Sequence, residues 1–199
     1  MNQEQKDKWI SIMQEHQDAD RLIQGRWLDE NNRGCFFGCA MQTNSNPLEK
    51  AIEAMDLPSW LVYLAEKIFE GLPLDQAVLF PVQLLKAIPV YADLEPVRHK
   101  IAIKRLTPLI KDSNGDEVNN AIKQVIEYHN NPCEVKRLTA RSAAWSAWST
   151  ELSESAVWSI ESAAWSTEGL EARSAETVGQ IKSVWIQERD NLIKALRSE

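Results

Sequence analysis

Two cysteines and a histidine are the residues whose types and spacing come nearest to a chemical site. Cys35 and Cys39 lie four positions apart in RGCFFGCA, so both thiols share one face if this segment is helical. Together with His16 they offer two sulfur ligands and one nitrogen ligand, a zinc-like set without a fourth member. Small buried cysteines beside glycines that allow tight turns would give the same pattern. Both interpretations stay open.

A thiol enzyme would need one of these cysteines to act as a nucleophile beside a histidine base held by a third group. Three histidines are present, and two aspartates closely follow the first of them. These candidates are His16, His99, His129, Asp18 and Asp20. They do not form the ordered signature of a cysteine-enzyme family. We therefore predict no catalytic residue, no metal ligand and no cofactor, and keep a Cys/His metal protein or thiol enzyme as the second alternative.

A basic segment at residues 98–105 is the other candidate site, with Arg98, Lys104 and Arg105 as predicted ligand contacts. It could bind a phosphate-bearing ligand if aromatic rings lie beside it, because guanidinium groups bind phosphate and indoles stack on a base. The rings and hydroxyls would come from a later tract, through Trp145, Trp148, Ser149 and Trp158. A solvated helix face would carry the same charges.

That tract, residues 139–171, is built almost entirely from Ala, Ser, Trp and Glu. Serines with a 4-3-4 spacing form one stripe of a helix, and the stripe recurs thirteen residues later. The two stripes are Ser142, Ser146, Ser149 and Ser153, then Ser155, Ser159, Ser162 and Ser166. A shift of thirteen residues rotates by about −140° around a helix, so the stripes face different neighbours. We favour a central helix contacted on two sides over a break near Glu154.

Four strings in the first half of the chain are distinctive as an ordered set. They are EHQDADRLIQG at 15–25, GCFFGCAMQ at 34–42, PSWLVYLAEKIFEGLP at 58–73 and FPVQLLKAIPVYADLEPV at 80–97. These strings are followed by a C-terminal tail that is rich in alanine and contains scattered aromatic residues. In this order they resemble a group of uncharacterised short proteins from bacteria and their phages. The resemblance covers the first half closely and the tail in character, and it implies kinship rather than an activity. Tyr91 stands where the group has glycine, so this turn is expected to differ.

The resemblance draws attention to the polar residues within these strings. His16, Asp20 and Gln24 are spaced four residues apart and would share one face of a helix. With Glu70 they could converge on a pocket, and we name the first three as candidate ligand-binding residues. A buried hydrogen-bond network that fixes the fold is the alternative.

The elements that must position these residues are all expected to be helices. An amphipathic helix is predicted over 3–24 and ended by Gly25, followed by a loop to Asn46. Further predicted helices cover 47–55, 59–71, two short segments between the prolines, 94–110 and 115–129. We expect an all-α protein, with a compact multi-helix domain at 1–131 and long C-terminal helices at 132–199 packed on it as one unit.

The composition, the N-terminal sequence and the length of the apolar runs predict where in the cell the protein is found. The chain has 199 residues, of which 44% are apolar, enough for a core. Three cysteines do not make a disulfide framework, the N-terminus does not have a signal-peptide layout, and apolar runs are too short to span a bilayer. We expect a soluble protein of the bacterial host cytoplasm with no membrane association.

The net charge of −7 argues against duplex nucleic acid as a partner. Residues 95–141 carry nine lysines and arginines against six acidic residues, a net charge of +3 that would favour an anion. We predict a non-catalytic binding protein, a phage accessory or immune-evasion protein that sequesters a host nucleotide signal. An acidic protein that binds and inhibits a host protein is the alternative. A homo-oligomer suits either, because small-residue helix faces with indoles favour contacts between subunits.

Overall fold

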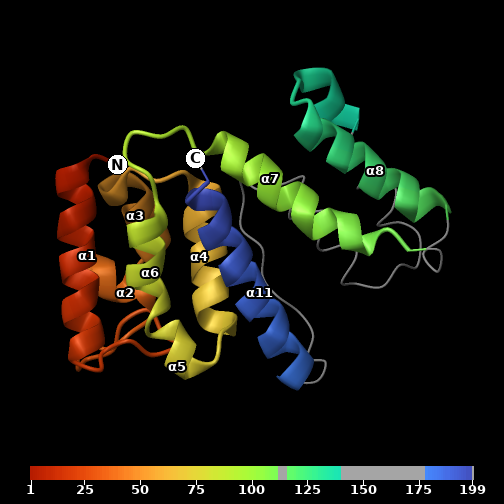
Figure 1. The fold of residues 1–199 in the computed structure, drawn as a ribbon. Coiled ribbons are helices and arrows are strands. Elements are labelled where there is room, and N and C mark those ends of the chain that lie inside the picture. The colour runs from red at the N-terminus through yellow and green to blue at the C-terminus, as the bar shows by residue number, and fades with distance from the viewer. Residues whose placement is uncertain (112–115, 140–177, 199) are drawn as a thin grey trace. The chain divides into compact units, whose positions relative to one another are not determined.

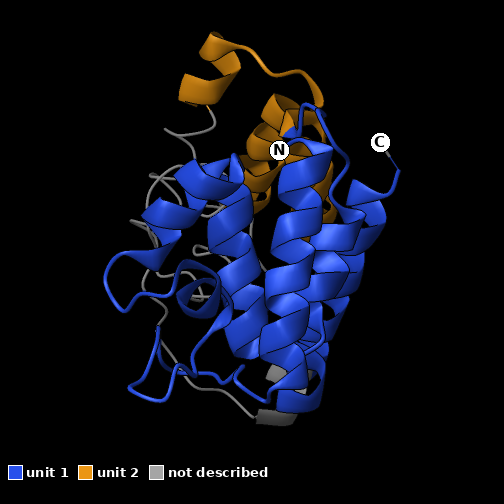
Figure 2. Cartoon of the chain, turned by 90° about the vertical axis from the view of Figure 1, so that its left-hand side faces the viewer, with its two compact units in different colours: residues 1–94, 172–199 blue, residues 95–171 orange. Residues whose placement is uncertain are grey.

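The structure, a computed structural model, describes residues 1–111, 116–139 and 178–198. Within these ranges every regular element is a helix, which confirms the all-α prediction (Figure 1). The chain divides into a first unit, residues 1–94 with 172–199, and a second unit, residues 95–171 (Figure 2). These units do not coincide with the boundary at 131 that the sequence suggested. Except for Thr139, the Ala/Ser/Trp/Glu tract lies outside the described residues.

The helices of the first unit come from both ends of the chain. They are α1 (Gln3–Asp18), α2 (Phe36–Met41), α3 (Pro47–Met55), α4 (Ser59–Gly71), α5 (Leu74–Ala77), α6 (Phe80–Ala87) and α11 (Val178–Leu196). Helix α1 packs on α6, and α11 packs on both α4 and α6. In Figure 1, α1 and α4 run in one direction while α6 and α11 run in the other. Phe36, Phe37, Phe69 and Phe80 are fully buried in the core of this unit.

The first helix is shorter than predicted, and the shared helix face of His16, Asp20 and Gln24 was wrong. Helix α1 ends at Asp18, and Asp20 adopts a left-handed conformation with φ of 51°. The Arg21 N–H then donates to His16 O at 3.0 Å, which closes a Schellman-type end. Aspartate tolerates this conformation better than most residues, so the helix ends six residues before the predicted end at residue 24.

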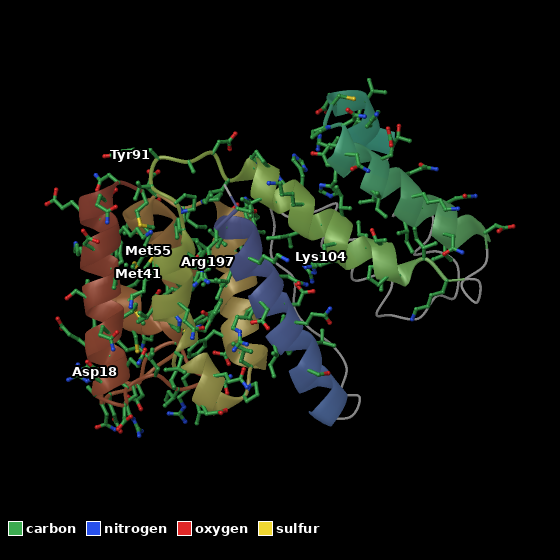
Figure 3. All side chains as sticks on the ribbon, viewed as in Figure 1. Asp18, Met41, Met55, Tyr91, Lys104 and Arg197 are labelled. Carbon is green, nitrogen blue, oxygen red and sulfur yellow. The ribbon has the colours of Figure 1, made fainter. Side chains whose placement is uncertain are left out.

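Two loop residues of the first unit, Asn46 and Tyr91, adopt a left-handed backbone conformation. Asn46 precedes α3 as its N-cap, but its side chain makes no capping hydrogen bond and its φ is 49°. Tyr91, where the resembling group has glycine, has φ of 59° and is 80% exposed (Figure 3). A tyrosine in this conformation is uncommon, and its N–H donates to Met1 O at 3.1 Å.

The second unit contains a helical hairpin. It consists of α7 (Glu95–Leu106), η1 (Thr107–Leu109) and α8 (Asp116–Asn130), followed by a helical turn at 134–139. Its core is formed by Leu106, Val118, Ile122 and Val125. Beyond this core, the Nδ1 atoms of His99 and His129 lie 2.8 Å apart and link α7 to α8.

Candidate functional site

The GCFFGCA segment forms helix α2, which a neighbouring backbone approaches very closely. A Cβ atom on Gly34 or Gly38 would overlap the carbonyl group of Trp27. The two glycines therefore allow contact between backbones, whereas the sequence suggested tight turns. The atoms of Trp27 that lie there belong to its backbone and not to its indole, and the residue as a whole is 40% exposed.

This contact fixes Cys35 at the start of α2. The Cys35 N–H donates to Arg26 O at 2.8 Å. Its Sγ accepts a hydrogen bond from the Gly38 N–H at 3.4 Å, in the manner of an N-cap. The thiol is fully buried.

Cys35 faces two carboxylates on helix α4. One ligand atom from each of Cys35, Glu66 and Glu70 lies within 4.8 Å of the other two. Glu66 is only 6% exposed, and neither of its carboxylate oxygens has a hydrogen-bond partner of good geometry. The nearby Cys35 thiol and Phe37 N–H partly offset the rise that burial causes in the pKa of this carboxyl. Glu70 lies at the exposed end of the cluster.

The pKa values in this cluster are raised by burial. Desolvation raises the pKa of Glu66 to about 7, helped by the charge of Glu70. Burial also raises the pKa of Cys35 far above its usual range, and the Glu66 and Glu70 charges add to this shift. The pKa of Glu70 is raised by desolvation and lowered by its hydrogen bond from Gly25. In this environment Cys35 is a thiol near neutral pH.

The segment that follows α1 makes hydrogen bonds to Glu70 and to the end of α4, at the exposed end of the cluster. Gly25, with φ of 82°, donates its N–H to Glu70 Oε2 at 2.8 Å. The Gln24 amide donates to Phe69 O at 2.6 Å and Leu72 O at 2.8 Å. Gln24 thus satisfies the carbonyl groups at the C-terminal end of α4.

His16 belongs to a different network. It is 5% exposed, and its Nε2 lies 2.9 Å from the Gln42 amide nitrogen, which also donates to Cys39 O at 2.6 Å. The Cys39 thiol lies 3.4 Å from Gly34 O, and burial raises its pKa to about 11. The zinc-like set of His16, Cys35 and Cys39 is therefore wrong, because Cys35 faces the α4 carboxylates instead.

The residues named from sequence as ligand contacts fall into three groups. In the first unit, Asp20 is exposed while His16 and Gln24 make the structural contacts just described. In the second unit, Arg98 forms an ion pair with Glu95 at 2.9 Å, and Lys104 is exposed (Figure 3). Arg105, on the same helix, is partly exposed. The third group, Trp145, Trp148, Ser149 and Trp158, lies outside the described residues.

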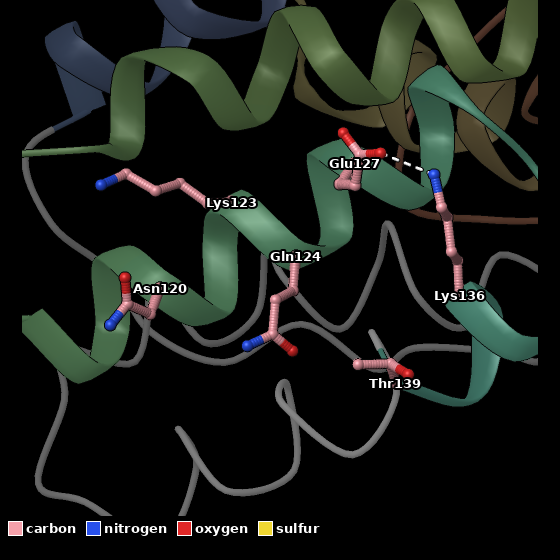
Figure 4. A pocket seen from close by; sticks show the side chains of 6 residues that line it. All are labelled: Asn120, Lys123, Gln124, Glu127, Lys136 and Thr139. Atoms are coloured by element: carbon pink, nitrogen blue, oxygen red, sulfur yellow. Dashed lines mark hydrogen bonds and ion pairs between the residues drawn. The ribbon is translucent and has the colours of Figure 1, made fainter.

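A pocket of about 480 Å³ opens beside α8 in the second unit (Figure 4). Its described lining residues are Asn120, Lys123, Gln124, Glu127, Lys136 and Thr139. The first four occupy one stripe of α8, at i, i+3, i+4 and i+7. Lys136 pairs with Glu127 at 2.6 Å, which lowers the pKa of Glu127. Two lysines against one glutamate leave this lining with a net positive charge.

Neither the pocket nor Glu66 was singled out from the sequence. Glu66 lies four residues after Val62 and three before Phe69, both buried, so it interrupts an apolar stripe that the sequence does display. From the sequence, the polar stripe of α8 is typical of an ordinary solvated helix face. Among the described residues, the turn at 134–139 adds Lys136 and Thr139 and makes this stripe one wall of a pocket.

Comparisons with protein-family models, curated proteins and solved structures found no match. Among the described helices, none combines the length and apolar character needed to cross a bilayer.

Proposed function

We propose that the protein is a non-catalytic binding protein whose ligand is a small anionic molecule, with a nucleotide as the first candidate. The pocket beside α8 is the site, and its size together with the amide and ammonium groups of its lining residues carries the proposal. A volume near 480 Å³ falls within the range of roughly 300–1,000 Å³ that small-molecule pockets occupy.

The side chains of the pocket have the chemistry that a phosphate-bearing ligand needs. Lys123 has no ion pair or hydrogen bond within the described residues, so its ammonium group is available to an anion. Lys136 is held in place by Glu127 and could share its remaining donors with the ligand. Asn120 and Gln124 add neutral amide groups that can bind the polar edge of a base or sugar.

Sequence continuity supports the same site. Thr139 lines the pocket and is also the first residue of the Ala/Ser/Trp/Glu tract. The tract thus begins at the pocket, and its indoles and hydroxyls are the groups that would stack on a base and bond its edges. The wider role, sequestration of a host nucleotide signal by a phage accessory protein, rests on the resemblance of the first half of the chain.

The two buried thiols, Cys35 and Cys39, do not suit thiol catalysis. Burial raises the pKa of both Cys35 and Cys39, whereas a nucleophilic cysteine needs a depressed pKa. Of the three candidate histidine bases, His16 belongs to the same unit as these thiols, and its Nε2 atom contacts the Gln42 amide.

The test is mass spectrometry of small molecules released by denaturing the purified protein after incubation with lysate of phage-infected cells. We expect a stoichiometric anionic species that is retained by the wild type and by Lys194→Glu but lost from Lys123→Glu. Lys194 is an exposed lysine on α11, so its reversal changes the net charge equally without touching the pocket.

Two results would count against the proposal. One is an empty extract from the folded protein, which would favour a host protein as the partner. The other is equal retention by Lys123→Glu and Lys194→Glu, which would place the ligand away from α8.

A further inference from the structure

We propose that Cys35, Glu66 and Glu70 form a binding site for a thiophilic divalent cation, with zinc as the best fit. The site lies wholly within the first unit and is independent of the pocket in the proposed function. It differs from the cysteine–histidine set that the sequence suggested, because both oxygen ligands come from α4 and histidine takes no part.

The geometry is close to that of a bound ion. Three atoms that lie no more than 4.8 Å apart can all lie within about 2.8 Å of one point. Zinc bonds to thiolate sulfur at ~2.3 Å and to carboxylate oxygen at ~2.0–2.2 Å. Small side-chain rotations would therefore bring all three atoms into coordination, with a fourth position left at the exposed Glu70 end.

Glu66 gives an independent reason to expect a ligand. Its side chain is more than nine-tenths buried, yet neither oxygen has a hydrogen-bond partner of good geometry. A buried carboxylate without such partners is costly unless a cation or further donors compensate it. The carboxylate faces the Cys35 sulfur and the Glu70 oxygen, so a cation among the three would satisfy it.

The chemical types of the three ligand atoms indicate which metal ion fits the site. One sulfur and two carboxylate oxygens suit zinc, whereas magnesium and calcium bind through oxygen alone. Binding would release the thiol proton from Cys35, because the thiolate is the ligand, and three negative ligands would surround a doubly positive ion. Gly25 already holds Glu70 Oε2 at 2.8 Å, which orients this carboxylate from outside the coordination shell.

The experiment uses the full chain, stripped of metal with a chelator and titrated with zinc by calorimetry and with cobalt by absorption spectroscopy. We expect one zinc per chain, a rise in Tm with zinc, and a thiolate-to-cobalt charge-transfer band. Glu66→Gln should fold, because it removes a buried charge at nearly constant volume, and should weaken zinc binding at least about tenfold. Cys35→Ser should abolish the cobalt band.

Cys133→Ser is the matched control, because Cys133 is exposed and lies outside the cluster. It should keep the band and the zinc affinity of the wild type. Should Cys35→Ser fail to fold, Glu70→Gln at the exposed end gives the same test of zinc affinity. The proposal is overturned if the folded wild type gives no cobalt–thiolate band, if Cys133→Ser loses it, or if Glu66→Gln binds zinc as tightly as the wild type.

Discussion

Gly71, the last residue of α4, lies directly against the indole of Trp185 on α11. A Cβ atom at Gly71 would overlap ring atoms Cγ, Cδ1 and Nε1 of that indole. The contact joins residues 114 positions apart in sequence, within one unit. A glycine at the end of a helix usually serves to terminate it; here the missing side chain also makes room for the helix from the other end of the chain.

We therefore expect Gly71→Ala to destabilise the protein, although alanine is the better helix former. The higher helix propensity of alanine, taken alone, would stabilise the protein by about 1 kcal/mol. Overlap with a rigid ring should cost more, about 1–3 kcal/mol. Urea unfolding followed by circular dichroism measures the net effect. In a Trp185→Leu background the same substitution should cost less, and an equal cost in both backgrounds would show that the indole is not the obstacle.

Gly38→Ala is expected to be more damaging, because its new methyl group would meet a backbone carbonyl rather than a side chain. The Trp27 carbonyl can move only if residues around it shift, and that loop also holds Cys35 through Arg26 O. We expect a loss of at least about 3 kcal/mol, or failure to fold. Ala40→Gly, on the same helix, is the control: it should cost only about 1 kcal/mol. Similar losses from the two changes would contradict the close approach.

The sequence predicts most of the helices but not the contacts that build the sites. The proline at the start of α3 and the glycine at the end of α4 predict these two helix boundaries correctly. Both residues act on the backbone at their own position, so no tertiary contact is needed to interpret them. The end of α1 was missed because Asp20 takes a left-handed conformation that nothing in the local pattern requires. Glu66 was missed because its partner Cys35 lies on a different helix, and such pairing depends on tertiary packing.

Gln24→Glu should destabilise the first unit, because it removes the amide that donates hydrogen bonds to the carbonyl groups at the C-terminal end of α4. The change replaces an amide donor with a carboxylate that would face the carbonyl groups of Phe69 and Leu72. We expect a loss of about 2–3 kcal/mol in the free energy of unfolding, measured by urea denaturation at neutral pH. Gln14→Glu is the control, because Gln14 is part of α1 and its amide bonds only the exposed side chain of Asp18. Equal effects of the two changes would show that the Gln24 hydrogen bonds contribute little.

His16 should make the stability of the protein depend on pH. Burial, together with the charge of Arg21, lowers the pKa of His16 below 6.5 in the folded chain. Above that pH both folded and unfolded chains hold a neutral imidazole, so the residue contributes no pH dependence. As the pH falls through about 6.5, the unfolded chain takes up a proton that the folded chain resists, and the free energy of unfolding declines until the lowered pKa is passed.

The measurement is urea denaturation at several pH values between about 7.5 and 5, on the wild type and on His16→Asn. Asparagine is polar but does not titrate, so the decline in stability toward low pH should be shallower in the variant. The difference between the two curves isolates His16 from other groups, including His99 and His129, which both proteins share. The Gln42 amide nitrogen can only donate, so His16 Nε2 accepts from it and the neutral ring carries its proton on Nδ1. A second proton would enter at Nε2, where it would face that amide N–H, while the buried Nδ1 has no hydrogen-bond partner to stabilise the charged ring. Parallel curves would mean that the folded protein accommodates the charged imidazole, and the structural role assigned to the Gln42 contact would then be wrong.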